Sequence, residues 1–138
     1  MRARRPSFPS EIVRALSALL VLGALAAPAQ AETRQIVGYA GVLGEWELTA
    51  TVNEETRLLG KAFSGPLSMK HVGICTQDGP EERTGEIRFQ ISALSSHLDA
   101  TLLVEGVACS YSAPSSNPYS GMMACPEREA VPLKLWLR

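Results

Sequence analysis

Alternation of apolar and polar residues is the feature that most limits how this chain can fold. Between residues 46 and 52 every second residue is apolar, and the residues between them are polar. Segments 87–92 and 98–104 repeat the pattern, and segment 131–137 places four aliphatic residues in the same phase. Because successive side chains of a strand point to opposite faces, this alternation predicts strands with one buried face.

Turn-forming residues separate these segments, so we expect about eight short strands. The predicted strands are 36–41, 45–52, 57–63, 67–75, 85–93, 98–104, 107–112 and 121–125, with 131–137 as a possible ninth. The connections between them are too short for helical crossovers, which favours an antiparallel meander. The fold class is therefore predicted as all-β, a single small domain forming either an up-and-down barrel or a flattened sandwich.

Three finer expectations concern strand boundaries and the core. Asn53, Glu54 and Glu55 are predicted to form a turn, although segment 54–63 would also suit a short helix. Pro132 cannot donate a backbone hydrogen bond, so we place it at a sheet edge or a strand start. The residues best suited to fill the core are Trp46, Leu48, Val52, Ile87, Phe89, Ile91, Leu102, Val104, Leu133 and Leu135.

The first 31 residues predict export. Four arginines precede an apolar stretch at 15–27, and Ala29-Gln30-Ala31 then offers the small residues that a signal peptidase recognises. The apolar stretch is shorter than the ~20 residues that a permanent membrane span requires. We therefore expect a signal peptide at 1–31 and a soluble β-domain at 32–138, periplasmic or secreted. A Sec-type signal is expected, and Arg4-Arg5 leaves the twin-arginine route open.

Net charge limits the possible partners. Cleavage would remove four of the 13 basic residues and one of the 14 acidic ones, so nine bases would face thirteen acids. An acidic domain without a basic run argues against nucleic acid and against an anionic membrane surface as partners. The expected partner is a protein or a small-molecule ligand in the cell envelope. We expect no cofactor and no membrane span after signal cleavage.

Cysteine spacing predicts one disulfide. The chain has three cysteines, and the segment between Cys109 and Cys125 is rich in turn formers centred on Asn117. Folding the strands back about Asn117 would place those two cysteines opposite one another. We therefore predict a Cys109–Cys125 bridge, with Cys75 as the spare thiol.

The loop inside that bridge is the leading candidate for partner contact. Tyr111, Asn117, Tyr119 and Met122 are the predicted binding residues, because rigid tyrosines and adaptable polar side chains suit recognition. With no catalytic signature in the sequence, the favoured function is a non-enzymatic binding or envelope-associated protein.

A soft-metal site is the first alternative. On a strand, Met69, His71 and Cys75 would project from one face, and thioether, imidazole and thiolate are ligands that copper prefers. Met122 or Met123 would supply a further sulfur. This alternative predicts a copper-binding protein.

A small hydrolase or thiol enzyme is the second alternative. His71 or His97 would act with Cys75, and His97 shares a strand face with Asp99. No Gly-x-Ser-x-Gly motif accompanies these residues, and a catalytic triad is defined by spatial arrangement that spacing alone does not give. The catalytic set is therefore left unassigned.

In size, export signal, strand content and a single disulfide, the chain resembles the small periplasmic barrels that include lysozyme inhibitors. The resemblance implies a barrel architecture. It carries over no inhibitory motif, and a fold does not establish a function.

Overall fold

The computed structural model describes residues 31–73 and 77–138 of the chain. The predicted signal peptide, apart from Ala31, lies outside these residues. Within them all regular structure is strand, and no helix is present. The strands are β1 (Glu32–Ala40), β2 (Trp46–Arg57), β3 (Gly60–His71), β4 (Glu82–Ser92), β5 (His97–Val104), β6 (Val107–Pro114), β7 (Tyr119–Ala124) and β8 (Val131–Leu137).

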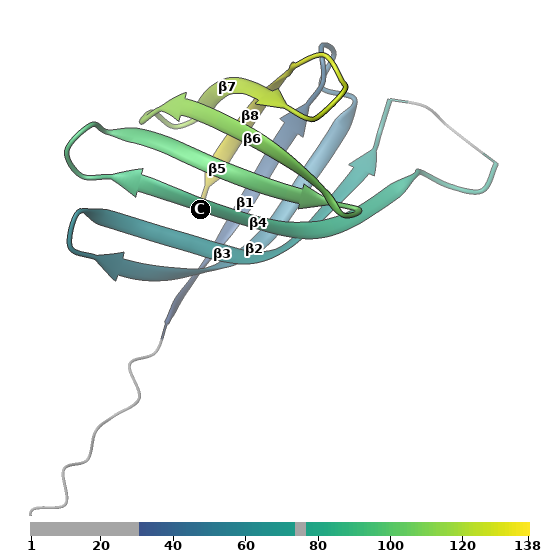
Figure 1. Cartoon of the computed structure of the whole chain (residues 1–138). Coiled ribbons are helices and arrows are strands. Elements are labelled where there is room, and N and C mark those ends of the chain that lie inside the picture. Colours follow the sequence, from purple (N-terminus) through teal and green to yellow (C-terminus); the bar gives the residue numbers. More distant parts are fainter. Residues whose placement is uncertain (1–30, 74–76) are drawn as a thin grey trace, which may run out of the picture.

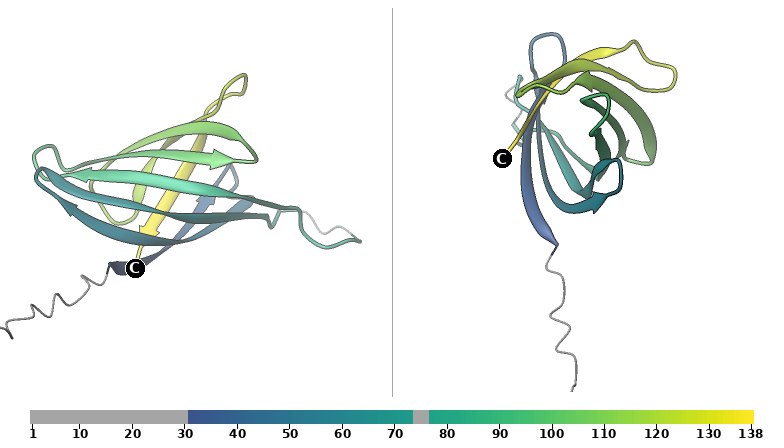
Figure 2. Two further views of the ribbon diagram at one scale, coloured as in Figure 1. Left: turned by 60° about the horizontal axis from the view of Figure 1, so that its bottom comes forward. Right: turned by 90° about the vertical axis from the view of Figure 1, so that its left-hand side faces the viewer.

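The eight strands form a closed up-and-down barrel (Figure 1). Each strand pairs antiparallel with the next along the chain, and β8 returns to pair with β1 from Ile36↔Leu137 to Ala40↔Leu133. The right-hand view of Figure 2 looks toward one end of the molecule and shows this ring. The predicted all-β meander is confirmed, and the pairing of β1 with β8 decides for the barrel over the sandwich.

The predicted turn at Asn53, Glu54 and Glu55 is wrong. These residues continue β2 to Arg57, and the chain reverses instead through the exposed pair Leu58 and Leu59. The carboxylate of Glu54 accepts a hydrogen bond from Arg34 on β1 at 3.3 Å and pairs with the ammonium of Lys61 on β3. These cross-strand partners hold the polar residues in an extended conformation, so the helix alternative for 54–63 is also wrong.

The two strands predicted at 57–63 and 67–75 are one strand, β3, which crosses Gly65 and Pro66 without ending. Pro66 lacks a backbone N–H, but its neighbours keep the register with β2, from Asn53↔Ser64 to Ala50↔Leu67. The register with β4 is unbroken across the proline. This merger reduces the predicted nine segments to eight strands.

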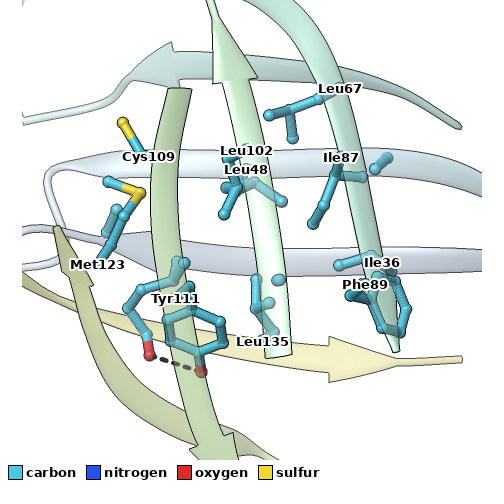
Figure 3. Close-up of a cluster of buried hydrophobic side chains, with 14 of the residues drawn as sticks. Ile36, Leu48, Leu67, Ile87, Phe89, Leu102, Cys109, Tyr111, Met123 and Leu135 are labelled. Carbon is cyan, nitrogen blue, oxygen red and sulfur yellow. Dashed lines mark hydrogen bonds between the residues drawn. The ribbon is translucent and has the colours of Figure 1, made fainter. Parts of the chain in front are cut away.

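The core fills the middle of the barrel (Figure 3). Inward side chains alternate with outward ones along every strand, as the sequence pattern requires. Of the ten predicted core residues, Trp46, Ile91 and Val104 are half-buried. The other seven are buried, namely Leu48, Val52, Ile87, Phe89, Leu102, Leu133 and Leu135.

A glycine and a proline occupy notable positions in the barrel wall. At Gly85, a Cβ would lie 1.8 Å from the Leu103 carbonyl oxygen, so only glycine allows β4 and β5 to approach this closely. Pro132 is the second residue of β8, where its carbonyl oxygen accepts a bond from the Gly41 N–H at 2.9 Å. Its position matches the predicted strand start.

Candidate functional site

One end of the barrel opens into a cavity of about 540 Å³, which we call the mouth cavity. It lies at the end where the β1–β2, β3–β4, β5–β6 and β7–β8 connections meet, on the right of Figure 1. The apolar part of its lining includes Trp46, Met69, Val104, Met123, Val131 and the Cys109–Cys125 disulfide, which come from six strands and one connection. The cavity therefore continues the apolar barrel interior toward solvent.

The deep part of the mouth cavity is formed by sulfur-bearing side chains. Met69, Cys109 and Met123 are all buried, and they come from β3, β6 and β7. Figure 3 shows Cys109 and Met123 next to each other at one side of the core cluster. Thioethers adapt to ligands of different shape, because methionine is unbranched and polarisable.

Cys109 and Cys125 form the predicted disulfide, with a Cα–Cα distance of 4.3 Å. Cys109 lies on β6, and Cys125 directly follows β7. The two strands share a short register, running from Ser110↔Ala124 to Ser112↔Met122. The bridge therefore fixes the part of the cavity wall with the least backbone pairing.

Trp46 forms one side of the opening and already contacts a cation. The guanidinium carbon of Arg83 lies 4.8 Å from the centre of a Trp46 ring, and Glu81 holds the same guanidinium at 2.8 Å. His71 meets the indole edge-on, with 4.7 Å between ring centres. A cation over a tryptophan face is attracted by the negative potential of that face.

Charged side chains surround the opening, and acids outnumber bases. We call this set the rim, and it consists of Glu45, Glu81, Glu82, Glu105, Glu129, Arg83 and Arg128. Of these, Glu45 is half-buried and accepts a hydrogen bond from the Leu43 N–H at 3.0 Å. The rim thus joins an apolar interior to a negatively charged entrance.

The opposite end of the barrel is closed by ion pairs instead. The side chain of Glu54 is only 8% exposed and lies between Arg34 and Lys61. The hydrogen bond from Lys61 is the main reason that the pKa of Glu54 is lowered, and burial opposes it. This end offers a satisfied charge network rather than an apolar opening.

A larger hollow of about 940 Å³ lies on the outer surface of β2 to β5. Its outward side chains include two ion pairs along the strands, Arg57 with Glu55 and Arg88 with Glu86. Ligand sites are mostly apolar with a few polar groups, so the mouth cavity is the better candidate.

The predicted contact residues do not form one surface. Tyr111 is 2% exposed, and its hydroxyl donates to the backbone carbonyls of Tyr119 at 2.9 Å and Leu133 at 3.2 Å. Burial of the ring raises the pKa of Tyr111 to about 12. Its placement among partner-contacting residues is therefore corrected: it is a core residue, because the alternation of β6 directs it inward (Figure 3).

The other three predicted contact residues lie apart. Met122 is 52% exposed on the outer wall of β7, whereas Tyr119 is half-buried. Asn117 is exposed in the β6–β7 connection, at the end of the barrel away from the mouth cavity. Contact with a partner through these residues stays a prediction.

The residues predicted to bind a soft metal do not all lie at one place in the described structure. Met69 and His71 share the inward phase of β3 near the mouth, but Cys75 lies outside the described residues. Met123 lines the cavity with Met69, whereas Met122 points outward. Within residues 31–73 and 77–138, no three His, Cys, Asp or Glu side chains gather as a metal site. Copper binding stays a prediction.

A polar cluster surrounds the second histidine on the outer wall. The Ser112 hydroxyl donates to Asp99 at 2.8 Å and lies 2.5 Å from the His97 ring nitrogen, while His97 and Asp99 are 4.0 Å apart. In a catalytic triad the histidine lies between carboxylate and hydroxyl. Here the Ser112 hydroxyl lies between Asp99 and His97, so the Asp99 carboxylate does not orient His97 as a general base.

The charged rim residues were missed by sequence analysis, and Arg83 is the one among them that a sequence signal could have found. Arg83 has the same strand phase as Ile87 and Phe89, so its side chain starts from the inner face of β4. A charged residue in the buried phase near a strand start is the signal that would have marked it.

Fold and site together define a closed β-barrel with one disulfide and one open end. No family model matches the chain, and neither a curated protein nor a solved structure matches it. Within the described ranges, no helix has the length and apolarity to cross a membrane.

Proposed function

We propose that the protein is a non-enzymatic, exported binding protein that takes a small, largely apolar molecule into the mouth cavity. The observation that carries this proposal is a cavity of about 540 Å³ at the open end of the barrel, with apolar side chains lining its inner part. Ligand cavities range over roughly 300–1,000 Å³, and barrels of this size hold at most one small ligand.

The chemistry of the lining supports binding over catalysis. Met69, Met123 and Val104 provide contact area, and the Cys109–Cys125 bridge occupies both of its sulfurs. His71 lies beside the lining, and its ring packs against Trp46. The lining is therefore suited to holding a molecule by apolar burial, which contributes ~25 cal/mol per Å² removed from water.

Export is part of the same proposal. The predicted signal at 1–31 supports it, and so does a disulfide at the cavity wall, because such bridges persist in oxidising compartments. A ligand of the periplasm or the extracellular space is thus the expected occupant.

The test uses the neutral apolar dye N-phenyl-1-naphthylamine, whose fluorescence rises in apolar surroundings. We expect saturable binding at a single equivalent, with decanol displacing the dye. Val104→Trp would place an indole inside the cavity and weaken binding at least about tenfold, a loss of ~1.4 kcal/mol. The neighbouring residue gives the matched control: Leu103 is 42% exposed on the outer wall, and Leu103→Trp leaves binding unchanged.

A second variant protects the test against misfolding. Val107 also lines the cavity but is 45% exposed, so Val107→Trp disturbs the core less than Val104→Trp. Thermal melting confirms that each variant folds. Absence of saturable dye binding by the wild-type protein, or equal binding by inner and outer tryptophan variants, overturns the proposal.

A further inference from the structure

We infer that the mouth cavity selects amphiphilic cations, with the apolar tail inside the barrel and the positive head at the rim. This inference rests on the proposed function, since it names the ligand class of the same cavity. It follows from the separation of apolar and charged lining along the cavity, from the charge balance of the rim and from the cation already held at Trp46.

Apolar and charged groups are separated along the depth of the cavity. Met69, Cys109 and Met123 are buried at the inner end, whereas Glu82 and Glu129 are exposed at the entrance. A ligand with one charged end can satisfy both regions only with its tail inward. A wholly apolar ligand would leave the rim without a partner, and a wholly polar one would lose the apolar contacts.

The charge balance of the rim favours a positive head. Five glutamates face two arginines, and Arg83 is already paired with Glu81 at 2.8 Å. The Glu82 carboxylate has an outside partner, Lys70 at 3.2 Å. Counting Lys70 with the rim still leaves two more negative than positive groups.

Two rim carboxylates are held by backbone groups rather than by cations. Glu105 accepts from the Thr84 N–H at 3.1 Å, and Glu45 accepts from the Leu43 N–H at 3.0 Å. A backbone amide orients a carboxylate without neutralising it. Among the described residues, neither carboxylate is therefore offset by an ion pair, and both can face an incoming head group.

Trp46 supplies an independent indication of cation recognition. Its ring face is already occupied by the Arg83 guanidinium at 4.8 Å. The Arg83 side chain is 34% exposed, so the guanidinium lies at the boundary between cavity and solvent. An alkylammonium head beside or in place of this group would meet the same aromatic face, a recurrent way to recognise quaternary ammonium.

The experiment compares three probes with the same tail: decyltrimethylammonium, decanol and decyl sulfate, each below its micelle concentration. Dye displacement gives their affinities. We expect the cation to bind about tenfold tighter than decanol, and decyl sulfate to bind weaker than decanol, because two uncompensated charges act at short range. Raising salt from about 50 to about 500 mM should reduce the difference in affinity between the cation and decyl sulfate, because salt screens the rim charges.

Rim variants locate the effect. Glu82→Gln combined with Glu129→Gln removes two exposed rim charges and should weaken the cation about threefold or more, with decanol unchanged. Glu32→Gln combined with Glu55→Gln makes the same charge change at the closed end, where these acids pair with Arg34 and Arg57. That control leaves the preference intact.

The outcomes separate the two proposals. If all three probes bind equally, or decyl sulfate binds tightest, the ligand class is wrong while the cavity remains a binding site. If the closed-end control removes the preference as fully as the rim variant, overall charge is the cause and the inference fails. If none of the probes displaces the dye and the dye itself does not bind, the proposed function fails with it.

Discussion

Reducing the Cys109–Cys125 bridge should cost this barrel about 3 kcal/mol of unfolding free energy. The two cysteines are 16 residues apart, and a cross-link closing a loop of that length removes ~3 kcal/mol of chain entropy from the unfolded state. Small domains unfold at a total of ~5–15 kcal/mol, so this is a large share. The melting temperature should fall by roughly 12–24 °C, since 1 kcal/mol corresponds to ~4–8 °C in a domain near this size.

Urea unfolding followed by circular dichroism measures the effect, with and without reductant. Reduced wild-type protein keeps both sulfurs in place, so it isolates the cross-link, whereas Cys109→Ala with Cys125→Ala also removes buried atoms and should cost somewhat more. Cys75→Ser is the control and should leave the reductant effect unchanged. A loss below about 1 kcal/mol, or a loss that disappears in Cys75→Ser, would refute the reasoning.

Three further predictions concern the core and the closed end. Phe89→Ala should lower the unfolding free energy by about 3–5 kcal/mol in urea titrations, because the ring stacks on Phe63 at 4.5 Å inside the barrel; a loss under ~1 kcal/mol would contradict the packing. Tyr111→Phe should cost about 1–2 kcal/mol and remove the ultraviolet titration step near pH 12, since burial raises the pKa of that phenol; an unchanged alkaline titration would show that another tyrosine causes the step. The lowered pKa of Glu54, caused first by its bond to Lys61, gives stability that is complete above the ordinary value of 4.5 and lost as pH falls through the lower folded pKa. Glu54→Gln should therefore flatten the acid limb of the stability curve, and an unchanged limb would contradict this.

The alternation of apolar and polar residues within single segments was enough to predict most strands of the barrel. Alternation identified the inward phase of Leu48, Ile87 and Leu102, because side-chain period alone decides which face of a strand is buried. The turn residues between Cys109 and Cys125 likewise predicted their pairing, since a short loop brings its two ends together. These inferences depend only on neighbours along the chain.

Features that depend on distant strands were not predictable in the same way. Glu54 lies in a segment whose residues suit a turn. Its extended conformation depends on Arg34 of β1 and Lys61 of β3, the two strands that pair with β2. Tyr111 has an amphipathic side chain suited to contact, but its hydroxyl finds backbone acceptors inside the barrel. The mouth cavity itself arises from four connections meeting at one end, which no single segment of sequence encodes.

Pairing of β1 with β8 has a consequence for the order in which the molecule can form. Ile36 pairs with Leu137, so the seam joins two strands that lie far apart in the sequence. Until β8 is available, β1 and β7 each present a row of unsatisfied amides and carbonyls, which is a template for other chains. Without this pairing, both edges would stay open to association with other strands. Closure of the β1–β8 seam, rather than pairing of consecutive strands, is the step that removes the last open edges of the sheet.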